Sequence, residues 1–141
     1  MIPTIITQLL NGETRLRLGS LEPTRDFNYV ADTVGGFMAL AESDAAVGEE
    51  VNISTGTEHT IGEVADLLIR ELNPDASVVT EDARLRPENS EVYRLIGDNS
   101  KIARLAGWNP RYDLRAGLHE TVRWFREPSN LGRYKAWLYN L

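Results

Sequence analysis

The chain has 141 residues, of which 42% are hydrophobic and 26% charged, and this composition is sufficient to bury a core of single-domain size. Its formal net charge of −6 argues against general nucleic-acid binding, which needs a basic face that neutralises phosphates. It does not exclude one small basic pocket. All but two of the fifteen basic residues are arginines, which suit phosphate recognition, although a GC-rich genome produces the same bias.

The absence of cysteine excludes disulfides, thiolate nucleophiles and cysteine-ligated zinc, and it favours a cytoplasmic setting. The first residues lack the basic head and long apolar run of a signal peptide. No stretch approaches the roughly 20 apolar residues of a membrane span, so we expect no membrane association.

The amino-terminal segment has apolar residues at helical spacing. With Pro3 near the start and Gly12 after the end, this spacing predicts a helix over 2–10. The alternating residues 15–18 predict a short strand. After a turn, residues 26–30 are expected to be extended.

A second helix is predicted over 31–43. Two glycines lie in its interior, where each costs about 1 kcal/mol relative to alanine. Close packing of another backbone would explain them, and so would a tolerated weakness of the helix. Four apolar residues fall on one face of this helix: Val34, Phe37, Met38 and Ala41.

The middle of the chain contains the clearest helix, over 60–72. Thr60 is the expected N-cap, and Glu63 stands three residues later, as in a capping box. A short strand is predicted before it, at 51–53, and another after it, at 77–81. The buried stripe of the helix is expected to comprise Ile61, Val64, Leu67, Leu68 and Leu72.

The last third begins with a polar loop over 82–91 and an extended segment over 92–97. A short helix follows at 98–106, ended by Gly107, and Pro110 prevents it from resuming.

A final amphipathic helix is predicted over 113–127, with Asp113 as its cap and Leu114, Leu118, Val122 and Phe125 facing inward. We expect Trp108 and Trp124 in the core as well. Residues 128–141 form a terminal aromatic segment.

Helices therefore dominate, and the strands between them are short. No run of strand–helix–strand units is long enough for a complete doubly wound sheet. The prediction is an α/β fold, a small helix-rich module with short strands and no complete Rossmann fold, forming a single domain over 1–141.

Several catalytic arrangements are missing from the sequence. The glycines never give the spacing of a dinucleotide-binding turn, and no phosphate-binding P-loop exists. None of the tyrosines has a lysine four residues later, so the Tyr-x-x-x-Lys acid–base pair of short-chain dehydrogenases is absent. His59 and His119 lack neighbours of the metal-ligand type and are read as solvated or capping residues. We assign no catalytic residue and no metal site.

The segment TRDFNYVAD points instead to anion binding. Arg25 lies close before an aromatic residue, and its guanidinium can point into a cleft while Asp26 or Asp32 orients it. In the segment RLRPENSEVYRL, a proline fixes the origin of Arg86, and Glu91 is an acceptor for a ribose hydroxyl pair.

Two arginines and one carboxylate from separate loops match a nucleotide diphosphate, because the planar donor fork of arginine fits phosphate oxygens. Surface ion pairing, worth at most about 1 kcal/mol, explains the same residues equally well.

At this point the sequence resembles a known family. The stretches RLRLGSLEPTRDFNYVADTVGGF, VNISTGTEHTIGEVADLL, RLRPENSEVYRLIGDNSKIARLAGWNP and LRAGLHETVRWF resemble, in order, the C-terminal half of the NAD-dependent epimerase/dehydratase family. These are extended short-chain dehydrogenases that act on nucleotide sugars. The resemblance covers essentially the whole chain, and its most specific part is DNSKIARLAGWNP. The motifs LGSLEPTRDF and RPENSEV, in the form that they take in this sequence, look closest to those of the 4,6-dehydratases.

The resemblance implies roles for particular residues. In such enzymes the arginines of the two motifs contact the substrate diphosphate and the acidic residue binds the ribose, which implies these roles for Arg25, Arg86 and Glu91. The sequence spacing between Arg86 and Glu91 is longer here than in some members of the family. The strand 15–18, which contains Leu16, would offer backbone groups to the nucleotide base. Asp98 and Ser100 are read as helix caps.

The NAD(P) site and the catalytic residues of this family belong to an N-terminal Rossmann domain that the chain does not contain. The resemblance therefore implies a fragment or split-gene product that binds a nucleotide diphosphate sugar but is not active alone. No cofactor is expected in this chain, although NAD(P) is implied for the full-length enzyme.

The alternative is a non-catalytic module, derived from such an enzyme, that pairs with the missing Rossmann half or with itself through exposed apolar surface. The candidate surfaces are the helix 2–10 and the tail residues Trp137, Leu138, Tyr139 and Leu141.

Overall fold

The computed structural model describes residues 1–81, 84 and 92–134 of the chain. These residues divide into two compact units. The first unit comprises Met1–Pro23, Thr60–Tyr93 and Leu118–Leu141, and the second comprises Thr24–His59 and Arg94–Gly117. Because the segments of the two units alternate along the sequence, no single linker separates consecutive halves. The assignment of 1–141 as one domain stays a prediction.

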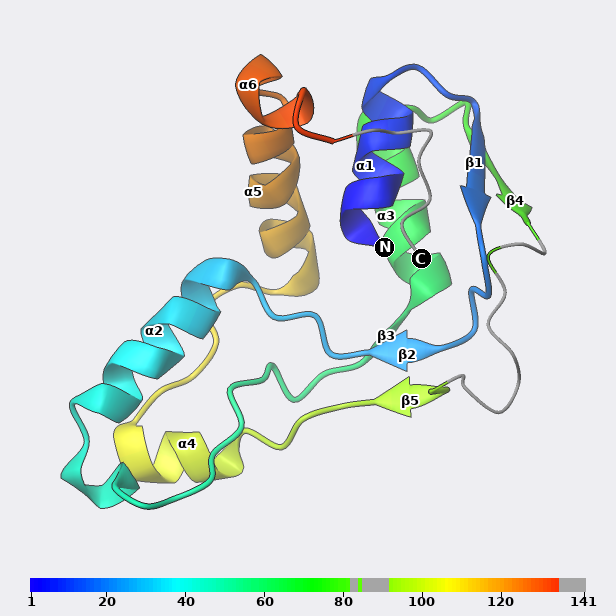
Figure 1. Ribbon diagram of the computed structural model, residues 1–141. Helices are drawn as coiled ribbons and strands as arrows, with labels where there is room; N and C mark the ends of the chain where they lie inside the picture. The colour runs from blue at the N-terminus through cyan, green and yellow to red at the C-terminus, as the bar shows by residue number, and fades with distance from the viewer. Residues whose placement is uncertain (82–83, 85–91, 135–141) are drawn as a thin grey trace. The chain divides into compact units, whose positions relative to one another are not determined.

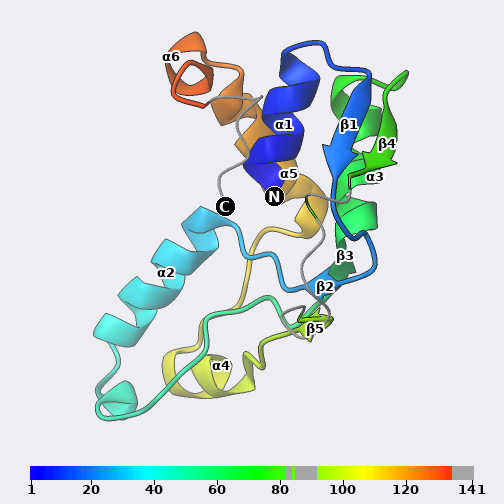
Figure 2. The ribbon, with the colours of Figure 1, turned by 45° about the vertical axis from the view of Figure 1, so that its right-hand side comes forward.

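The first unit packs two helices beside a two-stranded parallel sheet. Helices α1 (Ile2–Leu10) and α3 (Ile61–Leu72) lie side by side, as both ribbon views show (Figures 1 and 2). Strand β1 (Arg15–Leu18) pairs in parallel with β4 (Ser77–Thr80). The fully or almost fully buried side chains of these elements form the core: Ile5, Ile6, Leu9, Leu16, Leu18, Val64, Ala65 and Leu68.

Helix α3 begins where the sequence predicts. The Oγ1 atom of Thr60 accepts a hydrogen bond from the backbone N–H of Glu63 at 3.0 Å, and the Glu63 carboxylate accepts one from the backbone N–H of Thr60 at 2.8 Å. This reciprocal capping box satisfies two of the donors that every helix start leaves without intrahelical partners.

Helix α5 (Leu114–Phe125) begins in the second unit and continues in the first, and it is followed by α6 (Pro128–Leu131). Asp113 caps α5 by accepting a hydrogen bond from the backbone N–H of Ala116 at 2.8 Å. The prediction that Trp124 lies in the core is wrong, because its side chain is 42% exposed while the adjacent Phe125 is buried. Because a helix has 3.6 residues per turn, neighbouring residues point about 100° apart, which leaves Trp124 at the edge of the face that Phe125 buries.

The second unit contains β2 (Thr24–Arg25), α2 (Val30–Ala41), β5 (Arg94–Leu95) and α4 (Ser100–Ala106). Strand β2 lies between β5, with which it pairs in parallel, and the short strand β3 (His59–Thr60). Helix α4 ends at Gly107, whose φ of 64° gives the left-handed C-cap that the sequence predicts.

The predicted strand at 51–53 is not formed, since these residues are in no strand. The side chain of Ile53 instead packs against Gly36 of α2, where a Cβ atom would come within 2.6 Å of Ile53 Cγ2. For a Cβ atom at Gly35, the nearest atom would be the indole nitrogen of Trp108, at 3.5 Å. Side chains, and not the backbone of another element as predicted, therefore occupy the space beside both glycines.

The fold also corrects the expected partner surfaces. The apolar face of α1 is covered inside the first unit, since Ile5, Ile6 and Leu9 are buried there. The tail residues 137–141 lie outside the described part of the chain. Among the described residues, no helix is both long and apolar enough to span a bilayer.

Candidate functional site

Arg25 lies on β2, at the centre of the small sheet of the second unit. Thr24 pairs with Arg94 of β5, and Arg25 pairs with Leu95. The Arg25 side chain is partly buried, and its Nη1 atom donates a hydrogen bond to the carbonyl oxygen of Thr24 at 2.7 Å. The guanidinium group thus starts from backbone that is fixed by strand pairing on β2.

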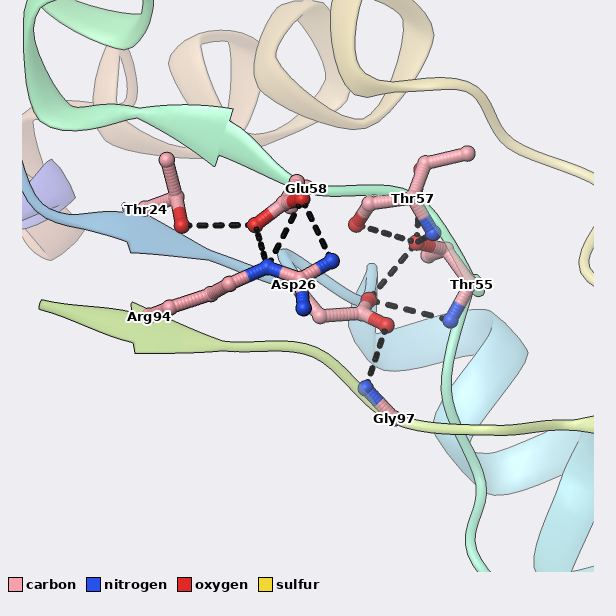
Figure 3. Close-up of polar contacts among 7 residues, drawn as sticks. All are labelled: Thr24, Asp26, Thr55, Thr57, Glu58, Arg94 and Gly97. Atoms are coloured by element: carbon pink, nitrogen blue, oxygen red, sulfur yellow. Dashed lines mark hydrogen bonds and ion pairs between the residues drawn. The ribbon is translucent and has the colours of Figure 1, made fainter.

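The residue that follows, Asp26, joins three segments of the second unit (Figure 3). Its Oδ1 atom accepts hydrogen bonds from the backbone N–H and the hydroxyl of Thr55, at 3.0 and 2.6 Å. Its Oδ2 atom accepts from the backbone N–H groups of Gly56 at 3.0 Å and Gly97 at 3.3 Å. One carboxylate therefore ties the end of β2 to a turn near residue 56 and to the segment after β5.

Asp32, the other carboxylate that the sequence offers as a partner for Arg25, is engaged elsewhere. It is 3% exposed, and its Oδ2 atom accepts hydrogen bonds from the backbone N–H groups of Arg111 and Tyr112, at 3.0 and 2.9 Å. Asp32 thus holds the segment after α4 against α2, and Asp26 is the carboxylate that borders Arg25 in the sequence.

A second carboxylate, Glu58, lies on the segment that leads into β3. Its two oxygens accept three hydrogen bonds from Arg94, with Nε at 2.9 and 3.0 Å and Nη2 at 2.8 Å, and Oε2 also accepts one from the Thr24 hydroxyl at 2.7 Å. These hydrogen bonds, chiefly that from Arg94, lower the pKa of Glu58 from its ordinary value. Figure 3 shows this cluster beside the Asp26 contacts.

Of the other residues predicted for the site, Leu16 alone falls in the described part of the chain. Arg86 and Glu91 lie outside the described residues. Leu16 lies in the first unit with its side chain fully buried, while the amide of Gln8 binds the backbone of the next residue, Arg17, with distances of 3.0 and 3.4 Å. The roles of all three predicted residues stay predictions.

Sequence reasoning missed the part played by Glu58, Arg94 and Thr55. The only signal for Thr55 is the Thr-Gly-Thr sequence, since threonine hydroxyls commonly stabilise turns. Gly56 supports that turn with a φ of 73°, a conformation that favours glycine. Nothing local in the sequence pairs Glu58 with Arg94, which lies 36 residues away.

The remaining predicted polar residues have structural roles. The Asp98 carboxylate accepts a hydrogen bond from the Ser100 backbone N–H at 2.8 Å, which lowers the pKa of Asp98. The N-cap of α4 is Asn99, whose side chain makes no capping hydrogen bond, and Ser100 is the first helical residue, so the prediction that Ser100 caps the helix is wrong. His119 is exposed, with Nδ1 3.0 Å from Glu71 Oε1. No cluster of three or more metal-ligating side chains occurs among the residues that the structure describes.

The second unit also contains a surface cleft of about 770 Å³ between α2 and the segment that follows α4. Met38, Glu42, Trp108 and Arg111 are among its lining residues. Its volume is in the range of small-molecule sites. Arg25 is not among the described residues that line it.

Comparison with known proteins places the chain among nucleotide-sugar enzymes. Residues 1–121 match the family described as GDP-mannose 4,6 dehydratase. UDP-glucuronic acid decarboxylase 1 of Xenopus tropicalis is 32% identical over 133 residues, which cover 90% of this chain and 29% of that protein.

Two solved structures are similar in both sequence and fold. An epimerase from Methanothermobacter thermautotrophicus superimposes with a TM-score of 0.83 at 33% identity, covering 94% of this chain and 38% of that one. The UDP-glucose 4-epimerase of Thermotoga maritima, solved with UDP-glucose, gives a TM-score of 0.76 at 29% identity, covering 89% and 39%.

The chain thus spans less than two fifths of the length of each of these three relatives. The helix-rich α/β architecture of the described residues, with its short strands, agrees with the predicted fold class. The match over residues 1–121 covers most of the sequence, including the TRDFNYVAD segment and the whole of the second unit. The chain therefore belongs to the GDP-mannose 4,6-dehydratase family, within the NAD-dependent nucleotide-sugar epimerases and dehydratases of the extended short-chain dehydrogenase type.

Proposed function

We propose that this chain is the nucleotide-sugar-binding part of an NAD-dependent dehydratase or epimerase, with Arg25 as a ligand of the diphosphate. The observation that carries the proposal is the anchoring of Arg25 on a paired strand that is tied down at both of its flanking residues. Thr24 is held by Glu58, and Asp26 is held by Thr55, Gly56 and Gly97. A fixed backbone lowers the entropic cost of presenting a guanidinium fork to phosphate oxygens.

Two carboxylates hold the strand on which Arg25 lies. Glu58 is occupied by Arg94, and Asp26 accepts hydrogen bonds from neutral groups that need an acceptor. The relative from Thermotoga maritima was solved with UDP-glucose, which is the class of ligand that we assign here. Arg86, Glu91 and the backbone around Leu16 complete the proposed site by family resemblance.

The described residues do not fit an NAD(P) site of their own. A dinucleotide site needs glycines clustered in one turn between a strand and a helix. The glycines of positive φ in the described residues, Gly12, Gly48, Gly56 and Gly107, lie in four separate turns. We therefore assign substrate binding and orientation to this chain, and we propose that it does not turn over substrate alone.

Thermal unfolding in the presence of UDP, GDP, dTDP and their sugars tests the proposal. A ligand at 100 times its dissociation constant adds about 2.7 kcal/mol to the free energy of unfolding, which is a shift of several degrees for a chain of this size. Arg25→Ala should remove the shift. Arg115→Ala, which removes an exposed arginine on α5 of the same unit, is the matched control and should retain it.

A shift that depends on the base and is lost only in Arg25→Ala would support the site and identify the nucleotide. No shift with any nucleotide, or an equal shift in Arg25→Ala, would contradict the proposed role of Arg25.

A second candidate function, an interaction module, is favoured by one face of α2. Four apolar side chains at helical spacing are largely exposed there: Val30 at 64%, Val34 at 51%, Phe37 at 65% and Met38 at 59%. The one charged residue of the helix, Asp32, is buried. A helix with no charged surface is typical of buried positions, so this face is the candidate for pairing with a second copy.

Light scattering over a range of protein concentrations tests this candidate. A mass that rises with concentration, and that Phe37→Asp restores to the monomer, would support pairing through α2. Val47→Asp is the control, because Val47 is an exposed apolar residue of the same unit that lies outside α2. A monomer at every concentration would contradict self-association.

A further inference from the structure

We propose that Asp26 is a positioning residue that fixes the strand from which Arg25 reaches its ligand. The proposal rests on the proposed function for its binding measurement, and it assigns to Asp26 no contact with the ligand. It is carried by the hydrogen bonds that join both ends of this residue, its backbone and its carboxylate, to segments far away in the sequence.

The backbone of Asp26 extends the pairing of β2 with β5. Its N–H group donates to the carbonyl oxygen of Leu95 at 2.9 Å, next to the paired residues Arg25 and Leu95. The sheet is short, since β2 has only two residues. Strands of two residues form few ladder hydrogen bonds, so neighbouring contacts decide whether the strand keeps its place.

The carboxylate supplies those contacts from the opposite side. It accepts hydrogen bonds from Thr55 and Gly56 on one segment and from Gly97, two residues after β5, on another. Three of these donors are backbone N–H groups, and hydrogen bonds to a charged acceptor are stronger than neutral ones. Asp26 therefore binds both neighbours of β2 at once.

The two segments that Asp26 joins, at Gly97 and at the Thr55 turn, lie close to each other. A Cβ atom at Gly97 would collide with the side chain of Ser54, so residue 97 approaches the turn more closely than any side chain would allow. The Thr55 hydroxyl also lies 2.8 Å from the Thr57 hydroxyl and accepts from the Thr57 backbone N–H at 3.1 Å. The turn that receives Asp26 is thus itself ordered by hydrogen bonds (Figure 3).

Asp26→Asn is the informative substitution. The asparagine keeps the size of the side chain and one acceptor oxygen for Thr55, but it places an amide donor opposite the N–H groups of Gly56 and Gly97. Asp44→Asn is the matched control, because Asp44 is an exposed aspartate of the same unit that lies outside the sheet.

The first measurement is amide hydrogen exchange of the chain without ligand. In Asp26→Asn, the protection factor of the residue 26 amide, which reports its hydrogen bond to Leu95, should fall by about tenfold or more, as should that of Gly97. In Asp44→Asn these two amides should keep their protection. A protected residue 26 amide in Asp26→Asn would overturn the proposal, whether or not the chain binds a nucleotide.

The second measurement is the dissociation constant of UDP, with inorganic pyrophosphate as a base-free probe, at a temperature where each variant is fully folded. Asp26→Asn should weaken binding by about tenfold, and it should have no further effect in an Arg25→Ala background, because the two residues act as one unit. A purely structural Asp26 would lower the melting temperature and leave the dissociation constant unchanged. That result would overturn the proposal.

If the wild-type chain binds neither probe, the proposed function fails, and the exchange experiment alone decides the role of Asp26.

Discussion

Gly36 of α2 lies directly against the side chain of Ile53, so closely that a Cβ atom at residue 36 would stand 2.6 Å from Cγ2 and 3.1 Å from Cδ1 of Ile53. This contact explains why a glycine occupies the middle of a helix, where it costs about 1 kcal/mol relative to alanine. Residues 51–53, which the sequence predicts to form a strand, are in no strand, and Ile53 supplies this contact instead.

The two adjacent glycines of α2 should respond oppositely to alanine. Gly36→Ala should destabilise the chain by about 1–3 kcal/mol, because Ile53 must move. Gly35→Ala should be neutral or stabilise by up to about 1 kcal/mol, because its nearest contact, the Trp108 indole nitrogen at 3.5 Å, is of ordinary length. Urea unfolding of both variants measures the difference, and equal effects would contradict the tight contact at Gly36.

The ion pair between Glu58 and Arg94 should make stability depend on pH in the acid range. The hydrogen bonds from Arg94 and Thr24 lower the pKa of Glu58 in the folded chain. The resulting stabilisation is present above the pKa of a free glutamate, about 4.3, and is lost as the pH falls through the lower folded-state pKa.

Melting temperatures of the wild type and Glu58→Gln should therefore differ at neutral pH and converge in acid. The difference should be small and should shrink in high salt, since Arg94 is largely exposed. A difference that grows on acidification would have the wrong sign for this mechanism.

Asp32 should be among the more sensitive positions of the second unit. Asp32→Ala leaves the backbone N–H groups of Arg111 and Tyr112 without their acceptor, and each such loss costs about 1–3 kcal/mol. Asp32→Asn retains an acceptor oxygen and should cost less. Asp44→Ala, at an exposed aspartate of the same unit, is the control in chemical unfolding and should have little effect. Equal stability of all three variants would show that the buried carboxylate is dispensable.

Removing the N-cap of α3 should lower stability by about 1 kcal/mol. Thr60→Ala deletes the acceptor for the Glu63 N–H, whereas Thr60→Ser retains it and should stay close to the wild type. Circular dichroism during thermal unfolding measures both variants. A serine variant as unstable as the alanine variant would indicate that the methyl group, and not the cap, matters at this position.

Local features were predictable from the sequence because their causes lie within a few residues. The capping box of α3, the left-handed Gly107 at the end of α4 and the Asp113 cap of α5 each involve groups no more than four residues apart. The same holds for helix α1 and strand β1, whose predicted bounds agree with the structure.

The environment of Arg25 was only partly predictable. The motif places Arg25 beside Asp26, and the sequence shows that both are charged. It does not show that the Asp26 carboxylate meets Gly97, 71 residues away, because that meeting depends on the parallel pairing of β2 with β5.

The sequence by itself determined where the main helices lie and the family to which the chain belongs, since periodicity, capping and motif order depend on residues that are close in the sequence. Only the tertiary structure decided which faces are buried. The apolar faces of α1 and α2 look alike as sequence, yet the first is covered within its unit and the second is exposed. The physical reason is that burial depends on which distant segments supply a complementary surface, as α3 does for α1.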